Sequence, residues 1–246
     1  MSLKIKNIFL FLSNYLFVIK YFIIILYLII LCLLFILFFK DEINNLLFFF
    51  NFLTINLILL IVLFIKLPQY NRRIKFLRLI QSVNSQKKGG ELIGVEIGVL
   101  NGKYSEKIYN YFKKKFNFHF YLIDPWKTFD NYHYDQKTLE KCYSNVKKKF
   151  GNIKKVKILR KTSLEASEDF ENQSLDFVYI DGNHEYNYVI KDLEIWFSKL
   201  KLNGVLFGDD YTTAYGVHKA VNEFSFKYNL SVKFSDNYKQ FCFIKN

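Results

Sequence analysis

A strand, a glycine turn and the start of a helix, in the stretch ELIGVEIGVLNGKYSEK at residues 91–107, constrain the fold of this chain most. Residues 92–97 are predicted to form a buried strand, and Gly98 and Gly102 mark the turn before the helix. Glu96 is an acid within this apolar strand. Because a buried carboxylate is costly without a partner, we expect a bound cofactor with hydroxyl or ammonium groups to meet it.

Short apolar segments alternate with amphipathic segments through the rest of the chain. The predicted strands are residues 92–97, 119–123, 156–160, 177–180, 204–208, 231–234 and 240–244. The predicted helices are residues 105–115, 138–149, 187–200 and 215–228. Such alternation is typical of an α/β fold, here a Rossmann-like, doubly wound and mainly parallel sheet of seven strands.

Two apolar runs precede this part of the chain. Residues 21–39 and 46–65 each come close to the ~20 residues that cross a bilayer as a helix. We therefore predict a transmembrane helical hairpin within a membrane anchor at residues 1–67, followed by a basic, helical connector at residues 68–88. A single span with the other run in the interface is the alternative. The apolar region is too long for a cleaved signal peptide and shows no small-residue cleavage site.

The net charge of +13 is concentrated near these runs, since residues 1–88 hold 11 Lys and Arg against 2 Asp and Glu. The positive-inside rule then makes the chain an integral membrane protein whose following domain is cytoplasmic. The nearly balanced charge of the later residues does not favour a nucleic-acid partner. Three widely spaced cysteines predict neither a disulfide framework nor a metal knuckle.

Polar residues follow each of the first five predicted strands, where ligands bind in open α/β sheets. They are Glu96 with Gly98 and Gly102, Asp124, Thr162 with Ser163 and Glu165, Asp181, and Asp209 with Asp210. An acid after the second strand, like Asp124, accepts hydrogen bonds from ribose hydroxyls in nucleotide-binding folds. The fingerprint G-x-G-x-x-G does not occur in this turn, which disfavours a nicotinamide or flavin cofactor.

The motifs VEIGVLNGKYS, LIDPW, IDGNHEY and LFGDDY together resemble those of class I S-adenosylmethionine-dependent methyltransferases. They are most similar to the small-molecule O-methyltransferase branch that includes the macrocin and sugar type. The resemblance covers residues 89–246, the predicted methyltransferase domain. It implies S-adenosylmethionine as the cofactor and a hydroxyl of a small molecule, a sugar or a lipid-linked glycan at the membrane surface as the acceptor.

The resemblance also implies roles for single residues. Those implied in cofactor binding are Glu96, Gly98 and Gly102 in the loop, Asp124 at the ribose, Trp126 and Ser163 at the adenine, and Asp181. In metal-dependent relatives, acids that match Asp181, Asp209 and Asp210 hold a divalent cation such as Mg²⁺. That cation would lower the pKa of the acceptor hydroxyl.

The candidate catalytic residues are His184 and Asp181. Some metal-dependent relatives have an acidic residue that acts as the general base two residues after the Asp181 position, where this chain has Asn183. His184 is adjacent and titrates near neutral pH, which makes it a candidate general base. A structural, hydrogen-bonded histidine is the alternative, as is a capping role for Asp209 or Asp210.

Two other functions compete with this one. The first is a catalytically inactive, membrane-tethered binding or scaffold protein on a methyltransferase fold, against which the intact Glu96, Gly98, Asp124 and Asp181 argue. The second is another Rossmann-type nucleotide-dependent enzyme, against which the missing glycine fingerprint argues. The identity of the acceptor and the oligomeric state are left open at this stage.

Overall fold

The computed structural model describes Thr54 and residues 75–85, 90–129, 134–235 and 238–246. Apart from Thr54, these residues belong to one compact unit, which begins at Pro68. Within the described ranges, no helix combines the length and the apolar character needed to cross a membrane. The spans predicted at residues 21–39 and 46–65 lie outside those ranges except at Thr54, so they stay predictions.

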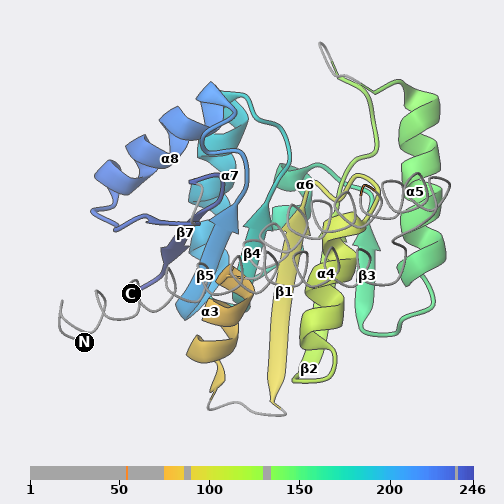
Figure 1. Cartoon of the computed structure of the whole chain (residues 1–246), viewed down its shortest axis with the longest axis horizontal. Coiled ribbons are helices and arrows are strands. Elements are labelled where there is room, and N and C mark those ends of the chain that lie inside the picture. Colours follow the sequence, from red (N-terminus) through yellow and green to blue (C-terminus); the bar gives the residue numbers. More distant parts are fainter. Residues whose placement is uncertain (1–53, 55–74, 86–89, 130–133, 236–237) are drawn as a thin grey trace, which may run out of the picture. The chain divides into compact units, whose positions relative to one another are not determined.

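Seven strands form one sheet with the spatial order β3-β2-β1-β4-β5-β7-β6 (Figure 1). They are β1 (Glu91–Ile97), β2 (Asn117–Ile123), β3 (Val156–Leu159), β4 (Leu175–Ile180), β5 (Leu200–Gly208), β6 (Lys233–Phe234) and β7 (Phe241–Ile244). The first five strands are mutually parallel, and β7 runs antiparallel to both β5 and β6. The predicted seven-stranded, mainly parallel sheet is confirmed.

Helices connect these strands. The described helices are α3 (Lys75–Val83), α4 (Lys103–Phe112), α5 (Gln136–Phe150), α6 (Ser163–Ser167), α7 (Tyr186–Lys199) and α8 (Tyr215–Lys227). Four of them, α4, α5, α7 and α8, confirm predicted helices. The short α6 was not predicted, although Thr162 and Glu165 form a capping box, a pattern that the sequence itself shows.

The sheet is covered on both faces, as a doubly wound fold requires. Side chains of α3, α4 and α5 pack on one face, and those of α6, α7 and α8 on the other. Alternate residues of β4 divide between the two cores, with Phe177 on the first and Val178 on the second. Figure 1 shows α5 and α8 at opposite ends of the sheet.

Helix α3 belongs to the folded core. Phe76, Leu77 and Ile80 are at most 2% exposed, and the ring centroid of Phe76 lies 6.0 Å from that of Phe207 in β5. The prediction of a connector at residues 68–88 is therefore corrected for Lys75–Val83. The three apolar side chains recur at helical spacing, so they form one stripe that the sheet buries, while Arg78 between them is exposed.

Candidate active site

The turn after β1 brings two loops into contact at the carboxyl end of the sheet. Gly98 and Gly102 have φ angles of 84° and 72°, which glycine adopts without a steric penalty. A Cβ atom on Gly98 would lie 1.9 Å from the carbonyl oxygen of Asp181. Only a glycine therefore allows the loop after β1 to touch the loop after β4.

Glu96, near the end of β1, is a buried acid with one carboxylate oxygen free to accept a hydrogen bond from a ligand. It is 1% exposed, and neither its Oε2 atom nor the hydroxyl of Ser105 in α4 has a hydrogen-bond partner within the described ranges. Burial is the main cause that raises the pKa of Glu96 well above its ordinary value, and the charges of Asp181 and Asp124 add to the shift. A buried, unpartnered carboxylate oxygen suits a ligand that brings its own donor groups.

Asp124 follows β2 and fixes the neighbouring loops. Its Oδ2 atom accepts the N–H of Leu100 at 2.9 Å, and its Oδ1 atom accepts the N–H of Trp126 at 2.7 Å. Burial raises the pKa of Asp124, and the backbone N–H groups oppose that shift. Each carboxylate oxygen has a second lone pair, so Asp124 keeps acceptor capacity for ribose hydroxyls.

Trp126 has a different place from the predicted one. Its side chain is fully buried, its φ is 44°, and its indole N–H donates to the carbonyl oxygen of Leu100 at 2.8 Å. The buried ring has no exposed surface to offer to an adenine. The predicted adenine contact of this ring is therefore corrected to a bracing role between the loops after β1 and β2.

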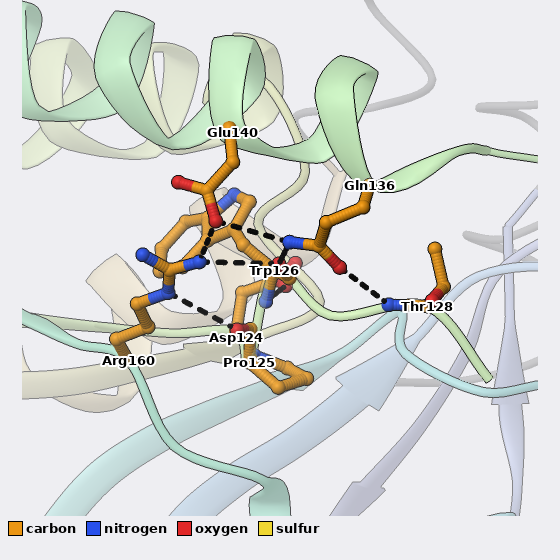
Figure 2. Close-up of polar contacts among 7 residues, drawn as sticks. All are labelled: Asp124, Pro125, Trp126, Thr128, Gln136, Glu140 and Arg160. Atoms are coloured by element: carbon orange, nitrogen blue, oxygen red, sulfur yellow. Dashed lines mark hydrogen bonds and ion pairs between the residues drawn. The ribbon is translucent and has the colours of Figure 1, made fainter.

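The first turn of α5 holds the loop after β2 through Gln136 (Figure 2). The amide nitrogen of Gln136 donates to the carbonyl oxygen of Trp126 at 2.9 Å, and its oxygen accepts the N–H of Thr128 at 3.2 Å. One side chain thus satisfies two backbone groups of the loop, which restricts where Asp124 and its neighbours lie.

Arg160, directly after β3, holds the same loop from the other side (Figure 2). Its guanidinium pairs with Glu140 of α5 and reaches the carbonyl oxygens of Pro125 and Trp126 at 3.4 and 3.5 Å. The planar guanidinium suits several acceptors at once. The loop after β2 is therefore attached to both α5 and the end of β3.

Ser163, predicted beside the adenine, has its hydroxyl bonded within the α6–α7 pair. It donates to Oδ1 of Asp192 at 2.6 Å and accepts the indole N–H of Trp196 at 2.7 Å. Burial raises the pKa of Asp192 to about 6, and the bond from Ser163 opposes the shift. The hydroxyl of Ser163 thus joins α6 to α7, and its predicted adenine contact stays a prediction.

Three ionisable side chains meet after β4 and β5. The Nε2 atom of His184 lies 3.5 Å from Oδ1 of Asp181 and 3.4 Å from Oδ2 of Asp210. The hydroxyl of Tyr179 donates to Oδ2 of Asp181 at 2.9 Å and so orients that carboxylate. The neighbouring Asp181 raises the pKa of His184, burial opposes the shift, and the charge of Asp210 adds to it.

The predicted metal set of Asp181, Asp209 and Asp210 stays a prediction, and the structure brings a partly different group of side chains together. Within the described ranges, the residues whose ligand atoms all lie within 4.8 Å of one another are Asp181, His184 and Asp210. Asp209 instead accepts the N–H of Asp210 at 3.0 Å. Two carboxylates and one imidazole fit a cation such as Mn²⁺ or Zn²⁺ better than the all-oxygen shell that Mg²⁺ prefers.

Lys239, between β6 and β7, also reaches this cluster. Its ammonium lies 3.2 Å from Oδ1 of Asp210 and 3.9 Å from Oδ2 of Asp209. Burial raises the pKa of Asp210, but the Thr213 hydroxyl, Lys239 and His184 outweigh it and leave the pKa below its ordinary value. Lys239 lies in no motif beside the acids, so the sequence did not identify it.

Residues 95–211 match the family model described as "Methyltransferase domain". This part of the chain is therefore similar to a methyltransferase domain. Among solved structures, the O-methyltransferase NovP shares the fold of this chain with a TM-score of 0.53 and 18% identity, over 72% of this chain and 78% of that chain. At this identity the likeness concerns the fold alone.

Two further proteins are similar to parts of this chain. The O-methyltransferase from Bacillus cereus, solved in complex with SAH, has a TM-score of 0.46 and 14% identity over 68% of this chain and 79% of that chain. The uncharacterized protein y4gI of Sinorhizobium fredii is 41% identical over 61 residues, which make up 24% of this chain. The match spans 7% of the length of that relative.

Proposed function

We propose that this chain is an S-adenosylmethionine-dependent methyltransferase that transfers the methyl group to a hydroxyl of a small molecule, such as a sugar or a lipid-linked glycan. The observation that carries the proposal is the position of the His184 imidazole between Asp181 and Asp210. Because Gly98 packs against Asp181, this group adjoins the cofactor turn. A hydroxyl that attacks a methyl group must lose its proton, and an imidazole is suited to accept it.

The residues of the turn fit S-adenosylmethionine. The unpartnered Oε2 of Glu96 suits the ammonium of its amino-acid part, and Asp124 retains acceptor capacity for its ribose hydroxyls. When bound, the cofactor supplies a methyl group on a positively charged sulfur. The chain contributes orientation, because Gln136 and Arg160 fix the loop that carries Asp124.

His184 would accept the hydroxyl proton at Nε2. The carboxylates of Asp181 and Asp210 then face the imidazolium that forms and stabilise its charge. The hydroxyl of Tyr179 keeps Asp181 in place for this task. The raised pKa makes His184 a stronger base, although it holds its own proton up to a higher pH.

A divalent cation held by Asp181, His184 and Asp210 is the second way to activate the hydroxyl. Such an ion would act as a Lewis acid on the acceptor oxygen. His184 would then be a ligand and not the base, so the two roles exclude each other. Activity that persists in a chelator would favour the histidine base, and activity that needs Mn²⁺ or Mg²⁺ would favour the cation.

Titration calorimetry of S-adenosylmethionine into the full-length chain in mild detergent tests the cofactor first. A screen of sugars and phenols as acceptors, with and without Mn²⁺ and Mg²⁺, then tests the reaction. Methyl transfer to a hydroxyl would support the proposal. Transfer to nitrogen or sulfur acceptors alone would overturn the choice of acceptor, and cofactor binding without any transfer would favour the binding-protein alternative.

We further propose that residues 1–67 anchor the enzyme to a membrane, with the catalytic domain on the cytoplasmic side. The support is the two apolar runs and the basic residues around them. Membranes that contain the full-length chain can be washed with alkaline carbonate. An anchored chain stays with the membrane pellet, and release into the supernatant would contradict the proposal.

A further inference from the structure

The acidic cluster after β4 and β5 contains a cation that the chain itself supplies. We propose that the Lys239 ammonium is the resident counter-ion of Asp209 and Asp210 and weakens the binding of a divalent cation to Asp181, His184 and Asp210. This inference rests on the site of the proposed function and concerns how that site is regulated.

The position of Lys239 is fixed by its backbone. The carbonyl oxygen of Lys239 accepts the N–H of Tyr211, directly after Asp210, at 2.9 Å. The next residue, Gln240, is 4% exposed, and its backbone exchanges hydrogen bonds with Ser235 at 2.9 Å in both directions. The backbone of Lys239 is therefore held next to Asp210, and its side chain reaches the Asp210 carboxylate from there.

Asp210 is the residue that the two cationic groups share. Lys239 contacts its Oδ1 atom at 3.2 Å, and His184 contacts its Oδ2 atom at 3.4 Å. The side chain of Asp210 is 19% exposed and that of Asp209 is 11% exposed, so water screens these charges less than it does at an open surface. The cluster is thus already partly neutralised from within the chain.

A divalent cation that binds Asp210 would lie a few ångströms from this ammonium. It would have to displace Lys239 from the carboxylate or bind against its repulsion, and both raise the dissociation constant. Loss of the Lys239 charge should therefore tighten cation binding. An arginine at this position should keep the binding weak, because it keeps the charge.

Titration of Mn²⁺ into the full-length chain, followed by calorimetry and by the electron paramagnetic resonance signal of free Mn²⁺, tests this inference. We expect Lys239→Gln and Lys239→Met to bind Mn²⁺ at least tenfold more tightly than the native chain, and Lys239→Arg to match the native chain. Lys233→Gln, in the neighbouring β6, removes the same charge away from the acids and should leave Mn²⁺ binding unchanged.

Equal or weaker Mn²⁺ binding by both neutral variants, with melting curves that show them folded, would overturn the role of Lys239. The role of Lys239 would also be overturned if Lys233→Gln tightened Mn²⁺ binding as much as the Lys239 variants do, since the change in net charge alone would then explain the effect. S-adenosylmethionine affinity is measured in parallel. If neither the native chain nor any variant bound S-adenosylmethionine, the proposed function would be refuted, but the comparison of Mn²⁺ affinities would still test the role of Lys239.

Discussion

The indole N–H of Trp126 donates to the carbonyl oxygen of Leu100 at 2.8 Å, while the N–H of Leu100 donates to Asp124 at 2.9 Å. These two bonds join the loop after β1 to the loop after β2. The two loops that the cofactor would contact are therefore held to each other as well as to the sheet. Cofactor affinity should depend on groups that never touch the cofactor.

Trp126→Phe tests this coupling. The ring remains apolar, but the buried carbonyl of Leu100 loses its donor, which should cost about 1 kcal/mol of unfolding free energy. S-adenosylhomocysteine should bind several-fold more weakly, as calorimetry would detect. Tyr111→Phe is the matched control, because it removes a hydrogen bond to Gln81, outside both loops. Equal losses of affinity in the two variants would contradict the coupling.

Arg160→Lys should weaken cofactor binding with little effect on stability. The ion pair with Glu140 is largely exposed, so water screens it and it contributes little to stability. A lysine cannot reproduce the contacts of the guanidinium with the loop carbonyls as well. Calorimetry with S-adenosylhomocysteine should show the loss, whereas Lys161→Met, which breaks the exposed pair with Asp169, should not. Unchanged affinity in Arg160→Lys would refute a positioning role.

Gly98→Ala should prevent folding or reduce the yield of folded protein severely. Its Cβ atom would meet the carbonyl oxygen of Asp181 at 1.9 Å, and its φ of 84° disfavours any side chain. Gly182→Ala is the control, since its Cβ would contact only Ile97 at 3.6 Å. Circular dichroism and melting curves of the two purified variants check the difference. A normally folded Gly98→Ala protein would show that the two loops can separate.

The buried Asp192 should make stability depend on pH. Its pKa of about 6 in the folded state lies above the ordinary value of 3.8, so the folded chain binds more protons between these values. Its stabilising contribution is complete below pH 3.8 and is lost as pH rises towards 6, by about 3 kcal/mol in all. Urea unfolding at pH 4.5, 5.5 and 7 should show this decrease, and Asp192→Asn should lack that part of it.

The activity should rise with pH if His184 is the base. Asp181 and Asp210 raise its pKa above the ordinary 6.5, so the midpoint of the acidic limb should lie above that pH. His184→Gln should lose this limb and about 10²-fold or more of kcat. A native pH–rate profile that His184→Gln only scales down, without changing its shape, would assign the proton transfer to another group.

Strand positions and strand-end acids could be predicted from local patterns. Each of the first five strands contains a short, nearly continuous apolar run. Such a run is typical of a strand that is buried on both faces of the sheet. The capping box at Thr162 and the apolar stripe of α3 are equally local patterns: the first indicates the start of α6, and the second indicates that the predicted helix at residues 68–88 has a buried face. The membrane spans lie outside the described residues and stay predictions.

The side-chain partners inside the site could not be predicted in this way. Ser163 and Trp126 stand at the positions that the motifs indicate, yet their polar atoms are bonded to Asp192, Trp196 and Leu100. Which partner a buried donor finds depends on the packing of helices that are far apart in the sequence.

The sequence by itself determined the alternating α/β order, the glycine turn and the row of acids, because these follow from local periodicity and backbone geometry. Only the tertiary structure decided that His184 lies with Asp181 and Asp210 and that Lys239 joins the acids from the loop between β6 and β7. The physical reason is that β7 pairs antiparallel beside β5. This pairing brings the residues before β7 next to those after β5. The two segments are far apart in the sequence, so no local sequence pattern predicts that they meet.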